Sequence, residues 1–142
     1  MKILVTGGLG FIGSHTVVEL DKSGFQPVII DNLYNSSTDV LDGLKKITGK
    51  DFPFYQIDCN DITSVRSLFE KEKFDGVIHF AAYKAVGESV DKPLEYYENN
   101  VLSLIILLKV MKEFNVNKFV FSSSCTVYGQ PENLPVTELT PR

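Results

Sequence analysis

Cysteine and histidine are scarce in this sequence, with only two of each among 142 residues. Cys59 and Cys125 lie far apart and match neither a disulfide framework nor a zinc-binding spacing, so we expect small packing residues in a reducing cytoplasm. His15 and His79 complete no metal-binding or catalytic set, and we expect structural roles for both, on a helix and in a strand. The sequence therefore predicts no metal site.

Blocks of like charge and long apolar runs are also missing. The 14 basic and 18 acidic residues are interspersed, with a net charge of −4, which excludes a basic groove for nucleic acid and a polybasic membrane patch. The longest apolar stretch, Leu104–Leu108, is far too short to span a bilayer. The first residues form an apolar run that we interpret as a core strand, leaving no room for a signal peptide.

Glycine, by contrast, is concentrated near the start of the chain. The apolar run Lys2–Thr6 leads directly into Gly7-Gly8-Leu9-Gly10-Phe11-Ile12-Gly13, which fits both G-x-G-x-x-G and G-x-x-G-x-x-G. A turn of this kind between a strand and a helix lets the backbone approach a pyrophosphate, whose charge the helix N-terminus then stabilises. The alternative is that these glycines only turn a tight corner.

An acidic residue stands where such a site needs one. The apolar run Pro27–Ile30 ends in Asp31, 18 residues after Gly13. A carboxylate at the end of the second strand accepts hydrogen bonds from the ribose 2′-hydroxyl and repels a 2′-phosphate. The sequence therefore predicts a dinucleotide site that prefers NAD to NADP.

Five apolar runs without polar alternation are separated by helical patterns. This arrangement predicts strands covered on both faces, in a doubly wound parallel α/β sheet of the Rossmann type. The expected strands are Lys2–Thr6, Pro27–Asp31, Phe54–Asp58, Gly76–Phe80 and Lys118–Ser122, and the expected helices lie near Phe11–Ser23, Thr38–Thr48, Ile62–Glu72 and Pro93–Asn115. Asp61 is a plausible N-cap, and Pro93 suits a first helical turn.

The periodic pattern ends at Gly129. Residues 130–142 contain three prolines and no periodicity, which is typical of a loop. We therefore expect residues 1–142 to be one incomplete domain, with the sheet truncated after the fifth strand, at the front of a larger protein.

Ligands of open α/β sheets bind beyond the carboxyl ends of the strands, which selects the candidate residues. The segments at those ends are Gly7–Gly13, Asp31–Ser36, Asp58–Cys59, Phe80–Lys84 and Ser122–Ser124. Several of these residues have structural alternatives: Asn35 and Ser36 could cap a helix before Thr38, and Asp58 could cap the turn that follows it. Lys84 could be a solvated surface residue, and the three serines could form a polar loop.

The predicted helix Pro93–Asn115 contains the segment Val101–Leu108, which is apolar on nearly all sides. A surface helix would show a single apolar stripe. We therefore expect this helix to be either deeply buried or covered by a partner, and we favour a homodimer contact.

Longer motifs resemble a known group. Residues 6–13 (TGGLGFIG) and 121–129 (FSSSCTVYG) resemble the extended short-chain dehydrogenase/reductase superfamily. Within it, residues 79–89 (HFAAYKAVGES) and 92–100 (KPLEYYENN) resemble the UDP-glucose 4-epimerase family. The resemblance covers the whole chain, with modest departures: Ala82-Tyr83 stands where the family usually has Gly-Leu, and Cys125 where it has Ala.

The resemblance implies tightly bound NAD and interconversion of UDP-galactose and UDP-glucose through transient hydride transfer from C4. It implies that Ser124 contacts the reacting 4-oxygen and that Lys84 contacts both cofactor and substrate. The implied cofactor-binding residues are Gly7, Gly10, Phe11, Ile12, Gly13, Asp31, Asn32, Tyr34, Asn35, Ser36, Asp58, Cys59, Phe80, Ala81, Ala82, Lys84 and Asn99.

Two features limit what the resemblance implies. Sugar-nucleotide dehydratases, the nearest rivals, typically carry an Asp-Glu pair where this sequence has Cys125-Thr126. The superfamily's Tyr-x-x-x-Lys dyad is also missing, because no tyrosine here is followed by lysine four residues later. We therefore expect an amino-terminal part of an epimerase that is inactive alone and lacks the UDP-sugar-binding domain. The alternative is a non-catalytic NAD-binding or interaction module.

Overall fold

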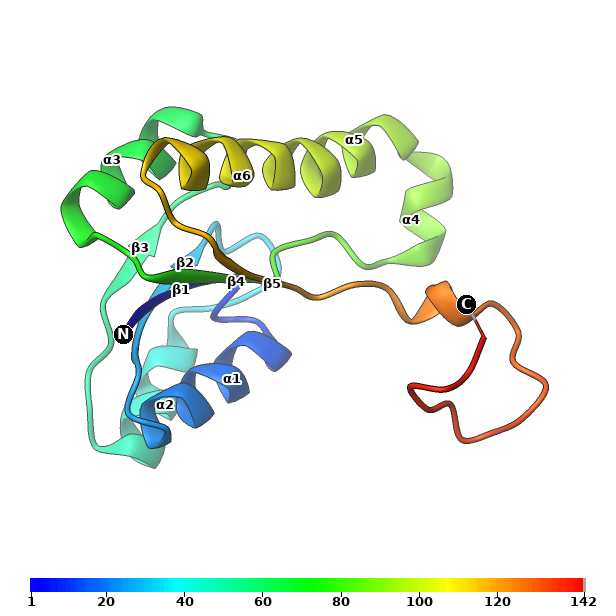
Figure 1. Cartoon of the computed structure of the whole chain (residues 1–142), viewed down its shortest axis with the longest axis horizontal. Coiled ribbons are helices and arrows are strands. Elements are labelled where there is room, and N and C mark those ends of the chain that lie inside the picture. The colour runs from blue at the N-terminus through cyan, green and yellow to red at the C-terminus, as the bar shows by residue number, and fades with distance from the viewer. Residues whose placement is uncertain (142) are drawn as a thin grey trace.

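A five-stranded sheet whose strands are all parallel lies at the centre of the structure, a computed structural model that describes residues 1–141 (Figure 1). Its strands are β1 (Lys2–Thr6), β2 (Gln26–Asp31), β3 (Phe54–Gln56), β4 (Gly76–His79) and β5 (Lys118–Phe121), in the spatial order β3-β2-β1-β4-β5. The order reverses direction beside β1, which pairs with both β2 and β4. The predicted doubly wound, Rossmann-type sheet is confirmed.

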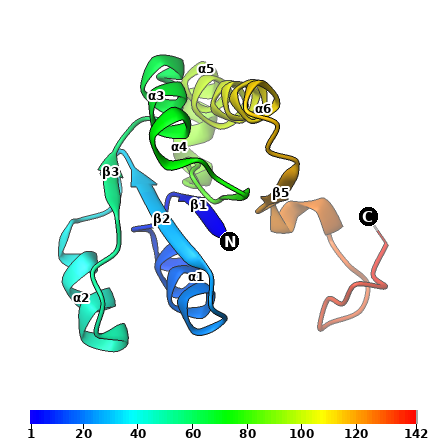
Figure 2. The same ribbon diagram turned by 60° about the vertical axis from the view of Figure 1, so that its left-hand side comes forward.

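Helices cover both faces of the sheet. One face carries α1 (Phe11–Lys22) and α2 (Asp39–Thr48), and the other carries α3 (Ile62–Glu72) and α6 (Ser103–Glu113), as Figures 1 and 2 show. Two short helices, α4 (Val86–Asp91) and α5 (Pro93–Tyr97), lie on the same side as α6 but beyond the carboxyl ends of the strands (Figure 1). A π-helical segment, η1 (Glu98–Leu102), joins α5 to α6, and a short 3-10 helix, η2 (Cys125–Tyr128), follows β5.

Two hydrophobic cores form because side chains alternate along each strand. In β1, Ile3 and Val5 join the core beneath α1 and α2, whereas Leu4 joins the core beneath α3 and α6. Ile29 and Ile30 of β2 divide in the same way, and both are fully buried. The apolar runs are continuous in the sequence because both faces are covered.

The structure corrects some predicted elements. Helix α4 was not predicted, and the predicted helix Pro93–Asn115 is divided by the wider turn of η1. Strand β3 ends at Gln56 instead of Asp58, because its pairing partner β2 ends at Asp31, opposite Gln56. The Asp58 carboxylate then accepts a hydrogen bond from the Asn60 backbone N–H at 2.8 Å in the turn that follows. The predicted bounds of β1 and α3 are confirmed, and those of β2, β4, β5, α1 and α2 differ by one residue at one end, where helix and strand ends fray.

The predicted helix starts are confirmed. One Asp61 carboxylate oxygen accepts hydrogen bonds from the backbone N–H groups of Thr63 and Ser64, at 3.0 and 3.2 Å, and so caps α3. Pro93 begins α5. Residues 129–141 form no helix or strand, in agreement with the predicted loop. None of the helices in the described residues has both the length and the apolar character needed to cross a membrane.

Candidate functional site

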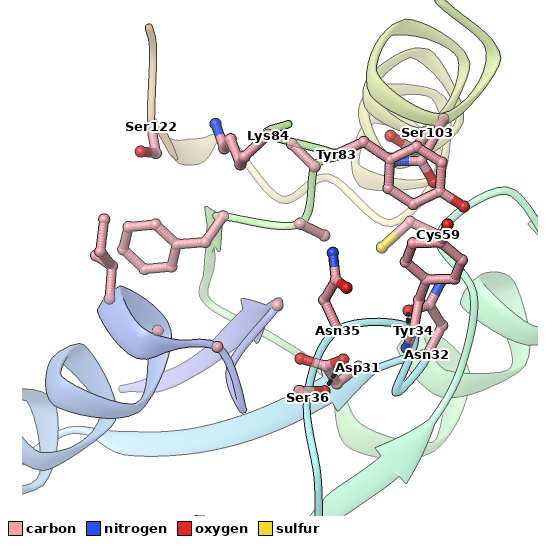
Figure 3. Close-up of a pocket in the computed structure, with 18 of the residues that line it drawn as sticks. Asp31, Asn32, Tyr34, Asn35, Ser36, Cys59, Tyr83, Lys84, Ser103 and Ser122 are labelled. Carbon is pink, nitrogen blue, oxygen red and sulfur yellow. Dashed lines mark hydrogen bonds between the residues drawn. The ribbon is translucent and has the colours of Figure 1, made fainter. Parts of the chain in front are cut away.

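One pocket, with a volume of about 640 Å³, opens at the carboxyl ends of the strands beside the point where the strand order reverses (Figure 3). Every residue implied by the sequence to bind cofactor or substrate lines it. These residues are Gly7, Gly10, Phe11, Ile12, Gly13, Asp31, Asn32, Tyr34, Asn35, Ser36, Asp58, Cys59, Phe80, Ala81, Ala82, Lys84, Asn99 and Ser124. The structure thus brings six separate stretches of chain to one cavity, while the individual roles of these residues stay predictions.

The glycine-rich turn forms the wall of the pocket beside α1. The Gly10 N–H donates to the Gly7 carbonyl at 3.0 Å, and Gly7 has a φ of 63°, which favours glycine. A Cβ at Gly7 would lie 2.8 Å from the backbone nitrogen of Ala81, and one at Gly13 would overlap the Gly7 carbonyl oxygen. The glycines therefore let the start of α1 and the loop after β4 approach the turn closely.

Asp31 holds the turn and the loop after β2 together. Its Oδ2 accepts a hydrogen bond from the Leu9 N–H at 3.1 Å, and its Oδ1 accepts from the Leu33 N–H at 3.0 Å and from the Ser36 hydroxyl at 2.7 Å. Figure 3 shows Ser36 directed toward this carboxylate. The alternative in which Ser36 caps the next helix is wrong, because its hydroxyl donates to Asp31 while the Ser37 hydroxyl accepts from the Asp39 N–H.

Asp58 both caps a turn and lines the pocket. Its Oδ1 accepts from the Asn60 N–H at 2.8 Å, as the structural alternative predicted, and its Oδ2 accepts from the Asn32 side-chain amide at 3.1 Å. Next to it, burial, together with the nearby carboxylates of Asp58 and Asp31, raises the pKa of the Cys59 thiol to about 12. Cys59 is therefore protonated near pH 7, and it packs in the core beneath α3 and α6, as predicted.

His79 stabilises the floor of the pocket. Its Nδ1 lies 2.6 Å from the Thr6 hydroxyl, and that hydroxyl also accepts a hydrogen bond from the Ala81 N–H at 3.2 Å. Burial lowers the pKa of His79 to about 4, and the positive charge of Lys84 contributes. The imidazole is therefore neutral near pH 7, in the structural role that the sequence predicted.

Lys84 and the serines after β5 line the opposite side of the pocket. Within residues 1–141, Lys84 takes part in no ion pair, so its charge is available to a ligand. The Ser124 hydroxyl lies 2.7 Å from the Thr126 hydroxyl and accepts a hydrogen bond from the Thr126 N–H. Ser124 is thereby fixed at the start of η2.

Sequence reasoning missed several side chains of the pocket. Val86 belongs to the unpredicted α4, and Ser103 lies in a stretch interpreted only as apolar. Tyr83 was considered only as part of a loop segment, although its side chain also lines the pocket. Its aromatic ring, in a position where the resembling family usually has leucine, was the available signal. The residues that the structure describes contain no group of three or more His, Cys, Asp or Glu side chains placed to hold a metal ion.

Solved structures match this arrangement closely. The UDP-glucose 4-epimerase of Bifidobacterium longum, in complex with NAD+ and UDP, is 51% identical and superposes with a TM-score of 0.92 over 99% of this chain and 42% of its own. The UDP-glucose-4-epimerase of Stenotrophomonas maltophila, with bound NAD and formylated UDP-arabinopyranose, is 44% identical with a TM-score of 0.92, over 99% of this chain and 42% of its own.

Curated sequences agree. The UDP-glucose 4-epimerase of Neisseria meningitidis serogroup C is 58% identical over 137 residues, which are 96% of this chain and 40% of that protein. The chain thus spans about two-fifths of the length of these relatives and corresponds to their amino-terminal part. The family model described as GDP-mannose 4,6 dehydratase matches residues 4–142. Since that model spans nearly the whole sequence, the chain belongs to the GDP-mannose 4,6 dehydratase family.

Proposed function

We propose that residues 1–142 form the NAD-binding part of a UDP-glucose 4-epimerase, which interconverts UDP-galactose and UDP-glucose. The observation that carries the proposal is that the glycine-rich turn, Asp31 and Ser124 line a single pocket. The relatives named UDP-glucose 4-epimerase, two of them with NAD in their structures, support it.

The pocket suggests how the dinucleotide lies. The start of α1 at Phe11 and Ile12 would hold the pyrophosphate, because helix N-termini carry free N–H groups and a positive dipole end. Asp31 would accept hydrogen bonds from the adenosine ribose, and its negative charge would disfavour the 2′-phosphate of NADP. Asp58 and Cys59 would then lie beside adenine, with Lys84 and Asn99 further along the cofactor.

Bound NAD would supply a hydride acceptor for C4 of the sugar. Ser124 would hold the reacting 4-oxygen by a hydrogen bond, since the backbone N–H and hydroxyl of Thr126 fix its position. Lys84 would bind the cofactor with its unpaired charge and could also reach the substrate. We expect Ser124→Ala, in the natural protein that contains this chain, to lower kcat with little change in NAD affinity. Equal kcat values would contradict this role.

The same features limit what residues 1–142 do alone. No tyrosine among residues 1–142 is followed by a lysine four residues later, so we propose that these residues bind cofactor without catalysing epimerisation by themselves. A 4,6-dehydratase is a second candidate, favoured by the description of the family model. Cys125-Thr126 at the position of the acid pair argues against elimination of water. Product analysis with UDP-galactose separates the two, because only epimerisation yields UDP-glucose.

We also propose that the complete protein is a homodimer. Val101, Ile105 and Leu108 are each more than 40% exposed on η1 and α6, whereas Leu107 and Val110 on the opposite side of α6 are buried. A second copy packing on the exposed face would remove this apolar surface from water. Sedimentation at micromolar concentration checks the proposal, and a monomeric mass would contradict it.

Calorimetric titration with NAD⁺ and NADP⁺ tests the cofactor assignment. The wild-type protein should bind NAD⁺ more tightly than NADP⁺. Asp31→Ala should weaken NAD⁺ binding because it removes the ribose acceptor and frees the Leu9 and Leu33 N–H groups. Unchanged NAD⁺ affinity in this variant would refute the role of Asp31.

A further inference from the structure

Two tyrosine rings from different loops meet at one end of the pocket. Tyr34 follows β2 and Tyr83 follows β4, yet their ring centroids are 4.7 Å apart with an interplanar angle of 33°. Both rings line the cavity near Cys59 (Figure 3). An aromatic pair at this separation is attractive, so the two rings connect the loop after β2 to the loop after β4.

Residues of η1 and α5 fix the position of Tyr83. The Asn100 side chain accepts a hydrogen bond from the Tyr83 N–H at 2.8 Å and donates to the Tyr83 carbonyl at 3.1 Å. Asn99 donates to the same Asn100 oxygen at 2.9 Å, and the Tyr96 ring packs edge-on against Tyr83 with centroids 5.4 Å apart. Tyr34, in contrast, is 55% exposed. Tyr83 is therefore the fixed member of the pair and Tyr34 the accessible one.

A buried hydroxyl without a partner lies at the same end of the pocket. Ser103 is only 2% exposed and lines the cavity, and its Oγ makes no hydrogen bond within the described residues. Leaving such a group unpaired is unfavourable, so a polar ligand atom at this place would satisfy it. The edge of an adenine ring carries both donors and acceptors, and its face stacks on aromatic rings.

We propose that Tyr83 and Ser103 form an adenine-recognition wall, in which the Tyr83 ring covers the base together with Tyr34 and the Ser103 hydroxyl binds its edge. Asn100 is a positioning residue, because it acts only through the backbone of Tyr83. This inference rests on the proposed function, since it assumes that the adenosine half of NAD lies between Asp31 and Cys59.

The first test measures dinucleotide release from the natural protein that contains this chain, by displacing bound NAD with excess NADH. We expect Tyr83→Leu to release NAD about tenfold faster than wild type, the factor typical of losing one aromatic contact to a base. Tyr83→Phe keeps the ring and should restore slow release. Tyr97→Leu is the matched control, because Tyr97 is 69% exposed on α5 and does not line the pocket. Equal rates in Tyr83→Leu and wild type would overturn the proposal.

The second test uses Ser103→Ala, which should weaken ligand binding without lowering the stability of the protein. Without ligand, the variant should melt at the same or a higher temperature, because an unpaired buried hydroxyl has been removed. The affinity of this variant for AMP, which serves as the probe, should be lower than that of wild type, because the adenine base loses a hydrogen bond. Ser67→Ala, an exposed serine on α3, is the control. Unchanged AMP affinity, or a loss of stability alone, would overturn the role of Ser103.

The test of Asn100 is a double-mutant cycle. Asn100→Ala should speed NAD release in the wild-type background and have little further effect in the Tyr83→Leu background, because both changes remove the same ring contact. Additive effects would contradict the positioning role. If wild-type protein binds no NAD at all, the proposed function fails and this inference with it. If wild type binds and the variants match it, only the inference fails.

Discussion

The two ends of the sheet use their polar groups differently. At the amino end, charges pair with one another: Lys2 with Glu72 at 2.9 Å and Lys50 with Asp21 at 2.7 Å. At the carboxyl end, Asp31 is bonded to backbone N–H groups and a hydroxyl, while within residues 1–141 Lys84 has no carboxylate partner. The charged side chains at the amino end therefore neutralise one another, whereas at the carboxyl end the positive charge of Lys84 can interact with a ligand.

Gly13→Ala should have the largest effect on NAD binding and stability, and the structural change should be limited to the carboxyl end of the sheet. The new Cβ would overlap the Gly7 carbonyl oxygen and lie 2.8 Å from the Gly8 Cα, so the turn must move away from α1. We expect loss of measurable NAD binding and a decrease of about 2 kcal/mol in the free energy of unfolding, as for other overpacked sites. Calorimetry and urea unfolding measure both.

Gly43→Ala is the matched control for this change. Gly43 lies within α2, and a Cβ there would meet nothing within 4 Å. The free energy of unfolding should rise by about 1 kcal/mol, the difference in helix propensity, with NAD binding unchanged. Normal NAD binding by Gly13→Ala would contradict the conclusion that the glycine-rich turn and α1 pack too closely for a Cβ at position 13.

Acid should weaken the carboxyl end at a higher pH than the amino end. The folded state lowers the pKa of His79 from 6.5 to about 4, so the unfolded chain binds more protons than the folded one between these values. Stability from the neutral imidazole is therefore complete above pH 6.5 and is lost as the pH falls toward 4. Hydrogen bonds from Tyr55 and Lys2 hold the pKa of Glu72 below the ordinary value of a glutamate, so the contribution of Glu72 to stability is lost only at lower pH.

The measurement is urea unfolding of wild type and His79→Phe at pH 7 and pH 4.5. The phenyl ring keeps the stacking on Phe119 and Phe121 but binds no proton. The wild-type protein should lose roughly 2 kcal/mol more than the variant between the two pH values. Equal losses would show that His79 does not carry the acid sensitivity.

Lys2→Met should have the smallest effect on stability, and the structural change should be limited to the amino end of the sheet. The ion pair with Glu72 is partly shielded from water, with side chains 31% and 13% exposed. Its removal should lower the free energy of unfolding by about 1 kcal/mol, the upper range for such pairs, and leave NAD affinity unchanged. A change in NAD affinity would show that the two ends are coupled.

The parts of the structure that depend on backbone constraints could be predicted from the sequence. The spacing of Gly7, Gly10 and Gly13 predicts a tight turn, and the continuous apolar runs predict a sheet covered on both faces. Together they allowed us to predict the strands and to place the pocket at their carboxyl ends. The Asp31 side chain was placed correctly because a strand end determines its position. These features depend on residues close together in the chain.

Features that depend on contacts between distant side chains could not be predicted. The Asn100 amide bonds the backbone of Tyr83 from 17 residues away, and no local pattern encodes that contact. The wide turn at Glu98–Leu102 interrupts a segment whose helical pattern is continuous. Strand β3 ends at Gln56 because its register with β2, a strand far away in the sequence, ends at Asp31.

The position of β1 at the centre of the sheet has a consequence for how the protein emerges from the ribosome. The first strand to be synthesised can pair with β2, and β2 can then pair with β3, as each appears, but the other edge of β1 has no partner until Gly76–His79 has been added. At about 5–20 residues per second, this wait lasts roughly 4–14 seconds. During that time an apolar strand edge at the middle of the future sheet is open to other chains, so cellular chaperones have their greatest opportunity to bind before β4 is made.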